Sequence, residues 1–216
     1  MAAAKKWSNV QVSMQSAIGS EITINGITKA SPGVVSYTGT DPSNGDYVFL
    51  TVSGMRQLND RVARVANVNG AGNTFELEGI DTTLFDTFTS GTFQVLTMGT
   101  SITTATSISS SGGDFDFIDT TTIHDNTRTQ MPGLPNATSF TFDNIWDISD
   151  TGLLAMKTAS DAQAKRAFKF QFGVGGQIMV FAGYVGASLL PGGSAQQLVT
   201  TSAAITMNGT PSYYAS

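Results

Sequence analysis

Three aspartates, Asp114, Asp116 and Asp119, have a spacing that could begin a metal site. Carboxylates at alternate positions open the calcium-binding loops of many proteins. Here Phe115 and Phe117 fill the intervening positions, and no glycine follows where a calcium loop makes its sharp turn. We therefore expect an acidic strand at this point and no metal ion.

The single histidine, His124, could act as a general base, but a hydrolase also needs a nucleophile and an orienting group beside it. The chain has no cysteine, and none of its serines stands in a Gly-x-Ser-x-Gly elbow. The glycines of residues 173–176 precede a strand pattern and not a helix, so they do not form a phosphate-binding loop. We expect no catalytic residue, no cofactor and no enzymatic activity.

The composition predicts the fold class. Charged residues make up only 12% of the 216 residues, and the chain is rich in Gly, Ser, Thr and Asn. Such a composition is typical of strands and turns, and it is poor in the residues that favour helices. A chain of this length can also bury a sizeable core. We predict an all-β protein.

The formal net charge of -5 and the pI near 4.6 argue against a protein that grips nucleic acid, because such proteins use clustered Lys and Arg. Two lysines near the N-terminus are not followed by an apolar run of signal-peptide length, and no stretch is long and apolar enough to span a membrane. We expect a protein that is made and assembled in the cytoplasm.

Residues 113–147 organise the rest of the chain. Apolar and polar residues alternate in 115–119 and again in 139–147, which predicts two strands with one apolar face each. The polar segment between them is longer than a tight hairpin connection and is rich in threonine. It predicts a protruding arm that becomes ordered against a partner.

The remainder of the second half reads as a β-sandwich with a single short helix against one edge. The helix is expected over residues 152–164, with Asp150 or Thr151 as its cap. Three strands are expected after it, over 167–172, 177–184 and 199–207. The Ser- and Thr-rich residues 97–112 fit either a linker or a strand, and we favour a strand at 101–107.

The first half has a different pattern. Residues 1–20 predict an arm or a first strand, in which Trp7 could anchor the chain to another copy. Residues 21–96 contain short strands at regular spacing, separated by turn signals such as Asn44-Gly45, and this is typical of a small β-barrel. We expect a separate module here that can be removed without loss of assembly.

The order of short motifs in the second half resembles the major tail tube protein of bacteriophages with long, non-contractile tails. The resembling segments are Gly113 to Asp119, Thr120-Thr121-Thr122, Met131-Pro132-Gly133-Leu134 and Phe140 to Asp147. The resemblance implies a virion protein whose residues 97–216 form a tail tube β-sandwich with an inter-ring loop at 120–135. It also implies hexameric rings that stack into a tube, through which DNA passes without specific binding. The implied partners are further copies of the chain, a tape-measure protein, and tail-terminator and tip proteins.

On this resemblance we assign candidate site residues. The predicted subunit interface comprises Trp7, Thr121, Thr122, His124, Arg128, Met131 and Pro132. Asp114 and Asp116 are predicted to face the lumen, where carboxylates would repel DNA.

Residues 21–96 resemble the small β-barrel known as the first catalytic cysteine half-domain of ubiquitin-activating enzymes. The resembling segments are Ile27 to Ala30, Ser43 to Asp46, Gly54-Met55 with Leu58-Asn59, Val65 to Val68 and Asn73 to Leu77. Since the chain lacks cysteine, the resemblance implies a scaffold. We expect the barrel to be an insert that decorates the outside of the tube.

A second function class stays open at this point. A β-sandwich with an aromatic platform could bind sugars, as an adhesion module on a phage or bacterial surface. The candidate platform residues are Tyr37, Tyr47, Tyr213 and Tyr214. Glycan binding without tube assembly would favour this alternative.

Overall fold

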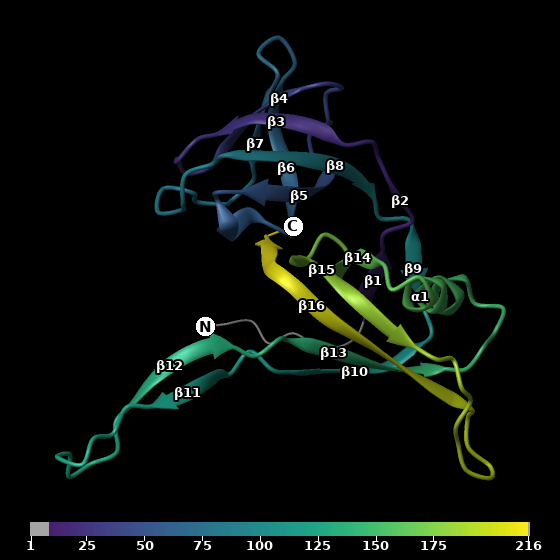
Figure 1. Cartoon of the computed structure of the whole chain (residues 1–216). Coiled ribbons are helices and arrows are strands. Elements are labelled where there is room, and N and C mark those ends of the chain that lie inside the picture. The colour runs from purple at the N-terminus through teal and green to yellow at the C-terminus, as the bar shows by residue number, and fades with distance from the viewer. Residues whose placement is uncertain (1–8, 216) are drawn as a thin grey trace.

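The computed structural model describes residues 9–215, and within them it contains two seven-stranded sheets, a two-stranded hairpin and one α-helix (Figure 1). The all-β fold with a single short helix and a small barrel is therefore confirmed. In chain order the elements are β1 (Val10–Met14), β2 (Ala17–Ile18), β3 (Ile22–Ile27), β4 (Val34–Thr38), β5 (Tyr47–Ser53), the 3-10 helix η1 (Arg56–Leu58), β6 (Arg61–Asn69), β7 (Thr74–Leu77), β8 (Ser90–Thr97), β9 (Thr100–Ile102), β10 (Ala105–Ser111), β11 (Phe115–Asp119), β12 (Gln130–Pro135), β13 (Ser139–Ile145), α1 (Thr151–Asp161), β14 (Lys165–Phe172), β15 (Ile178–Ala187) and β16 (Thr200–Tyr214).

The barrel is built from six short antiparallel strands in the order β8-β3-β4-β7-β6-β5, and pairing of β5 with β8 closes it. Alternate residues of these strands point inward, as the sequence pattern predicts. Three rings meet at the centre: Tyr37, Phe75 and Phe93 have centroids 5.1 to 5.7 Å apart. The barrel therefore has a core of its own. Its likeness to the ubiquitin-activating half-domain stays a prediction.

The second large sheet has the order β10-β13-β16-β15-β14-β1-β9. The chain leaves this sheet after β1, builds the barrel, and returns at β9, which pairs with β1. The barrel thus interrupts the sheet between two neighbouring strands. The expected first strand near the N-terminus is β1, whereas Trp7 lies outside the described residues.

The sheet curls around its own core. Strands β13 and β14 are separated by β16 and β15, yet the rings of Phe140 and Phe170 are only 5.4 Å apart. A flat sheet would hold such strands about 14 Å apart, at nearly 5 Å per strand. The two layers of the sandwich are therefore two halves of one curved sheet, packed over phenylalanines.

Helix α1 covers the same core with Leu153, Met156 and Ala159. The side chain of Asp150 caps the helix by accepting a 2.8 Å hydrogen bond from the Leu153 amide. Asp150 is one of the two residues that were predicted as the cap. The helix ends at Asp161, three residues before the predicted end, because Gln163 adopts a left-handed conformation with φ of 48°.

Two further predictions about element ends are wrong. Strand β16 runs on to Tyr214 and does not stop at residue 207, because β15 offers it a long partner with a bulge between Val180 and Ala182. Residues 130–135, predicted as part of a loop, form β12, because β11 supplies the pairing strand. In both places a non-local partner overrides turn-forming residues in the sequence.

The barrel packs against the face of the curved sheet that lies opposite its phenylalanine core. Val62 and Leu96 of the barrel share a buried cluster with Val180, Ala182 and other residues of the sheet. Polar groups reinforce the contact, and their partners are Lys165 Nζ with Asp60 Oδ1 at 2.6 Å, Arg61 Nε with Ser212 Oγ at 2.9 Å and the Arg64 amide with the Tyr214 hydroxyl at 2.7 Å. The barrel is thus fixed against the sheet on which it sits.

Candidate assembly interface

A hairpin continues β10 and β13 beyond the edge of the curved sheet, and we call its residues 113–138 the arm (Figure 1). The arm begins at Gly112 and Gly113, which both adopt φ of 86°, a conformation that other residues rarely tolerate. The amide of Asn136 donates a 2.8 Å hydrogen bond to the carbonyl of Asp114 and so joins the two sides of the hairpin at its base. The glycines therefore let the hairpin change direction where it leaves the sheet.

The arm carries large apolar side chains that nothing in the described chain covers. Phe117 is 62% exposed and Leu134 is 85% exposed. Phe115, Ile118 and Met131 are also exposed. The predicted apolar face of β11 stays uncovered, because a two-stranded hairpin has no second layer to pack against it. Exposed apolar groups on this scale mark an interaction surface.

The tip of the arm holds its own shape through threonines. The amide of Thr122 donates to Asp125 Oδ2 at 2.8 Å, and the amide of Thr129 donates to Thr121 Oγ1 at 3.0 Å. Hydrogen bonds from the Thr122 amide and hydroxyl lower the pKa of the Asp125 carboxyl. Thr121 and Thr122, predicted as interface residues, are thus in the exposed tip and engaged within it.

Arg128 reaches back to Asp119, with Nε and Oδ2 3.1 Å apart. The pKa of Asp119 is lowered mainly by hydrogen bonds from Thr121, and Arg128 adds to this effect. His124 lies at the same tip and is exposed. The structure therefore places these candidate residues on one loop, where a neighbouring molecule could contact them.

The remaining candidates lie on the strands of the arm. Met131 pairs with Ile118, and Pro132 pairs with Phe117. Asp116, predicted to face the lumen, is exposed and accepts a 3.2 Å hydrogen bond from Asn136 Nδ2. Asp114 is exposed at the base of the arm. The sequence analysis did not identify the exposed Phe115, Phe117, Ile118 and Leu134 as interface residues. A signal was available, because β11 has apolar residues on both of its faces.

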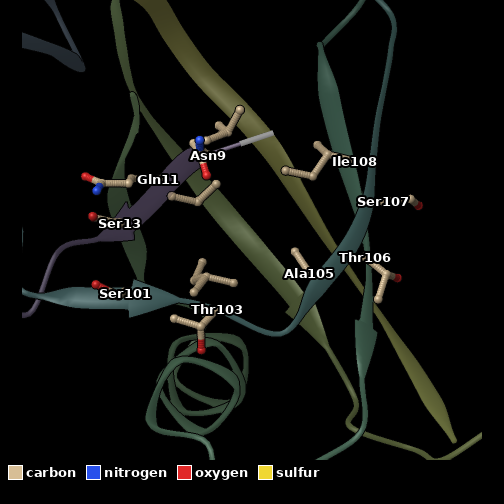
Figure 2. A pocket seen from close by; sticks show the side chains of 12 residues that line it. Asn9, Gln11, Ser13, Ser101, Thr103, Ala105, Thr106, Ser107 and Ile108 are labelled. Atoms are coloured by element: carbon tan, nitrogen blue, oxygen red, sulfur yellow. The ribbon is translucent and has the colours of Figure 1, made fainter. Parts of the chain in front are cut away.

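A groove opens between β10 on one side and β1 with β9 on the other, and we call it the notch (Figure 2). Its lining residues are Asn9 to Ser13, Ser101 to Thr103 and Ala105 to Ile108. None of these carries a charge. No local pattern in the chain indicates the notch, because its walls are neighbours only after the sheet has curled.

Other kinds of site find no support in residues 9–215. Within this range no three His, Asp or Glu side chains gather where they could hold a metal ion. No helix in the same range is long and apolar enough to cross a membrane.

Comparison with known families supplies the identity. The family model described as phage tail tube protein matches residues 53–216, which is more than half of the chain. This chain belongs to the phage tail tube protein family. No curated protein matches it. The match includes the last three strands of the barrel and all of the sheet from β9 onward.

Membership of the tail tube family makes the chain a structural protein of the phage tail, located in the virion, which assembles with itself and with other tail components. The resemblance drawn from the motifs of residues 113–147 is thereby confirmed. A structural family of this kind favours a role without catalysis.

The aromatic platform of the sugar-binding alternative does not form in this tail tube protein. Tyr37 is buried in the barrel core, and Tyr214 is buried where the barrel meets the sheet. Tyr47 is half-buried beside Tyr214, and only Tyr213 is well exposed. The prediction of a shared platform is wrong, because alternate residues of each strand point to opposite faces.

Proposed function

We propose that six copies of this chain close into a ring, that rings stack into the tail tube, and that DNA passes through its lumen. The observation that carries the proposal is the arm, whose apolar side chains are left uncovered in the single chain. A two-stranded hairpin is only marginally stable alone in water. It gains a stable environment when it packs against a neighbouring copy.

The parts of the chain take distinct places in this tube. Residues 97–216, together with β1, build the wall, and residues 120–135, which comprise the tip of the arm and β12, contact the adjacent ring. In this arrangement Trp7, Thr121, Thr122, His124, Arg128, Met131 and Pro132 are interface residues. The barrel of residues 21–96 projects outward and decorates the surface.

The negative charge of the chain supports the proposal that DNA passes through the tube. The chain has a formal net charge of -5, and Asp114 and Asp116 add carboxylates to the exposed surface of the arm. Facing the lumen, these groups repel phosphate, so DNA slides without being held. The tail-terminator and tip proteins bind at the ends of the tube, and the tape-measure protein binds in its interior. Assembly takes place in the host cytoplasm.

The test replaces apolar side chains of the arm by charged ones. The double variant Phe117→Asp, Ile118→Asp places two carboxylates where we expect a neighbouring copy to pack. Because these side chains touch no core, the variant should stay folded, while negative-stain microscopy should show no tubes. The matched control is Leu84→Asp, which changes a 94% exposed leucine of the barrel and should leave tubes intact. Normal tubes from the double variant would contradict the proposal.

A further inference from the structure

The notch is the open side of the core inside the curved sheet. Val10, Ala105 and Ile108 line it, and each is only half-buried while packing against the buried core cluster. Figure 2 shows β9 and β10 leading away from the turn near Thr103, with the groove open between them. The core therefore ends at a gap that is bounded by strands and not by a further layer.

Both walls of the notch contain stretches of strand edge that have no main-chain partner among residues 9–215. Strand β10 pairs only with β13, and β1 pairs with β9 only from Val12 onward, which leaves Val10 and Gln11 unpaired on that side. Free edges in natural sheets are commonly blocked by lysine or proline. Neither β10 nor β1 contains either residue. These edges can accept another strand.

The arm of the same molecule cannot fill the notch. Strand β10 forms one wall of the notch, and the arm starts only two residues after β10 ends. From there the arm extends away from the sheet (Figure 1). An arm that fills the notch therefore comes from another molecule.

Strand β11 of the arm has the properties that the notch requires. Its five residues all keep an amide hydrogen, whereas Pro132 and Pro135 of β12 have none, so β11 is the edge of the arm that can pair with a further strand. Phe115 and Phe117 provide apolar side chains for the half-buried floor. The uncharged walls of the notch also present no like charge to Asp116.

We propose that the notch of one copy receives β11 from the arm of a second copy by addition of a strand to the sheet. Main-chain hydrogen bonds then join the two copies, and the phenylalanines set the register. The contact completes the core of the receiving copy. This inference rests on the proposed tube assembly and names the surface that the arm occupies in it.

The experiment uses the absence of native cysteine, which leaves no background for engineered disulfides. The full-length double variant Ile108→Cys, Phe117→Cys is assembled under reducing conditions, checked for tubes by microscopy, and then oxidised. We expect a ladder of covalent multimers on a non-reducing gel, which reductant removes. The matched control, Thr40→Cys with Phe117→Cys, moves one thiol to the exposed surface of the barrel and should give no ladder. A second pair, Ala105→Cys with Phe115→Cys, repeats the test if the first disturbs assembly.

The outcomes separate this inference from the proposed function. Tubes that form without a ladder from either arm and notch pair overturn the inference and leave the tube proposal standing. A ladder that appears only after removal of residues 1–8 would assign the notch to the N-terminal segment and also overturn it. Absence of tubes from the unmodified chain would overturn both.

Discussion

Asp60 of the barrel bonds to two residues of the sheet, Lys165 and Asn208. Its carboxylate accepts from Lys165 Nζ at 2.6 Å and from Asn208 Nδ2 at 3.2 Å, and both side chains of the ion pair are about a quarter exposed. Asp60 also adopts φ of 58°, which asparagine tolerates well. The variant Asp60→Asn therefore removes the charge without adding backbone strain.

We expect Asp60→Asn to lower the free energy of unfolding by about 1–2 kcal/mol, because Lys165 is left with a partly buried charge and no carboxylate. Urea denaturation measures the change. The matched control is Asp161→Asn, which breaks the exposed pair with Lys157 on α1 and should cost less than about 0.5 kcal/mol. Equal losses in the two variants would show that the Asp60 contact adds nothing to the junction.

Tyr37 gives the barrel a dependence on alkaline pH. Burial, with the hydrogen bond to Asp41 and its charge, raises the pKa of Tyr37 from 10.0 to about 12. Below pH 10 the tyrosine is protonated in both states, so its contribution is fully present. Between pH 10 and 12 the unfolded chain loses the proton first, and stability falls as pH rises.

Removal of the Tyr37 hydroxyl tests whether stability falls as the pH rises from 10 to 12. Tyr37→Phe should cost about 1 kcal/mol at pH 8 through loss of the hydrogen bond to Asp41. It should also make unfolding less sensitive to pH between 10 and 12 than in the parent chain. Urea denaturation at pH 8 and pH 11 checks both effects. An unchanged pH response would show that Tyr37 ionises as readily in the fold as in the unfolded chain.

At the scale of elements, the direction of the arm depends on Gly112. A Cβ at this position would lie 2.2 Å from the carbonyl oxygen of Ala137, and φ is 86°. Gly112→Ala should therefore shift the arm, while the core stays intact because the arm does not contribute to it. We expect thermal unfolding to change little and tube formation to be lost in negative-stain images.

The matched control for this variant is Gly186→Ala, at a site with ordinary backbone where the nearest atom to a new Cβ would be 3.9 Å away. It should assemble as the parent chain does. Tubes from both variants would mean that assembly tolerates a displaced arm.

At the scale of the whole molecule, the barrel and the sheet depend on each other. The barrel closes over a core of its own, but Ile178, Val180 and Tyr214 of the sheet are covered by barrel residues such as Val62 and Leu96. This shared cluster argues against the expectation that the barrel can be removed without loss of assembly. Removal would expose an apolar patch on β15 and β16.

We expect residues 17–97 alone to fold, and a chain in which these residues are replaced by a short turn to aggregate or to unfold at lower temperature. Thermal unfolding and light scattering measure the effect. Adding Ile178→Thr and Val180→Thr to the shortened chain should restore solubility, since these changes make the uncovered patch polar. A shortened chain that is soluble and stable without them would contradict the importance of the shared cluster.

Local patterns in the sequence were sufficient for most of the strands, for a helix cap at Asp150 or Thr151, for the turn-rich barrel segment and for the existence of the arm. The predicted single strand at 101–107 is wrong, because these residues are divided between β9 and β10. Alternation and capping act over a few residues, so they can be seen in the chain itself. The motifs of residues 113–147 likewise pointed to the tail tube family, which the family match supports.

Only the tertiary structure decided which edges stay unpaired and which apolar faces stay uncovered. Phe117 reads as a core residue in the sequence, yet its strand has no second layer to cover it. The notch exists because Val10 and Ile108, far apart in the chain, line its opposite walls where the sheet curls without closing. The order of strands depends on pairings between distant segments, and alternation within one strand cannot specify its neighbour.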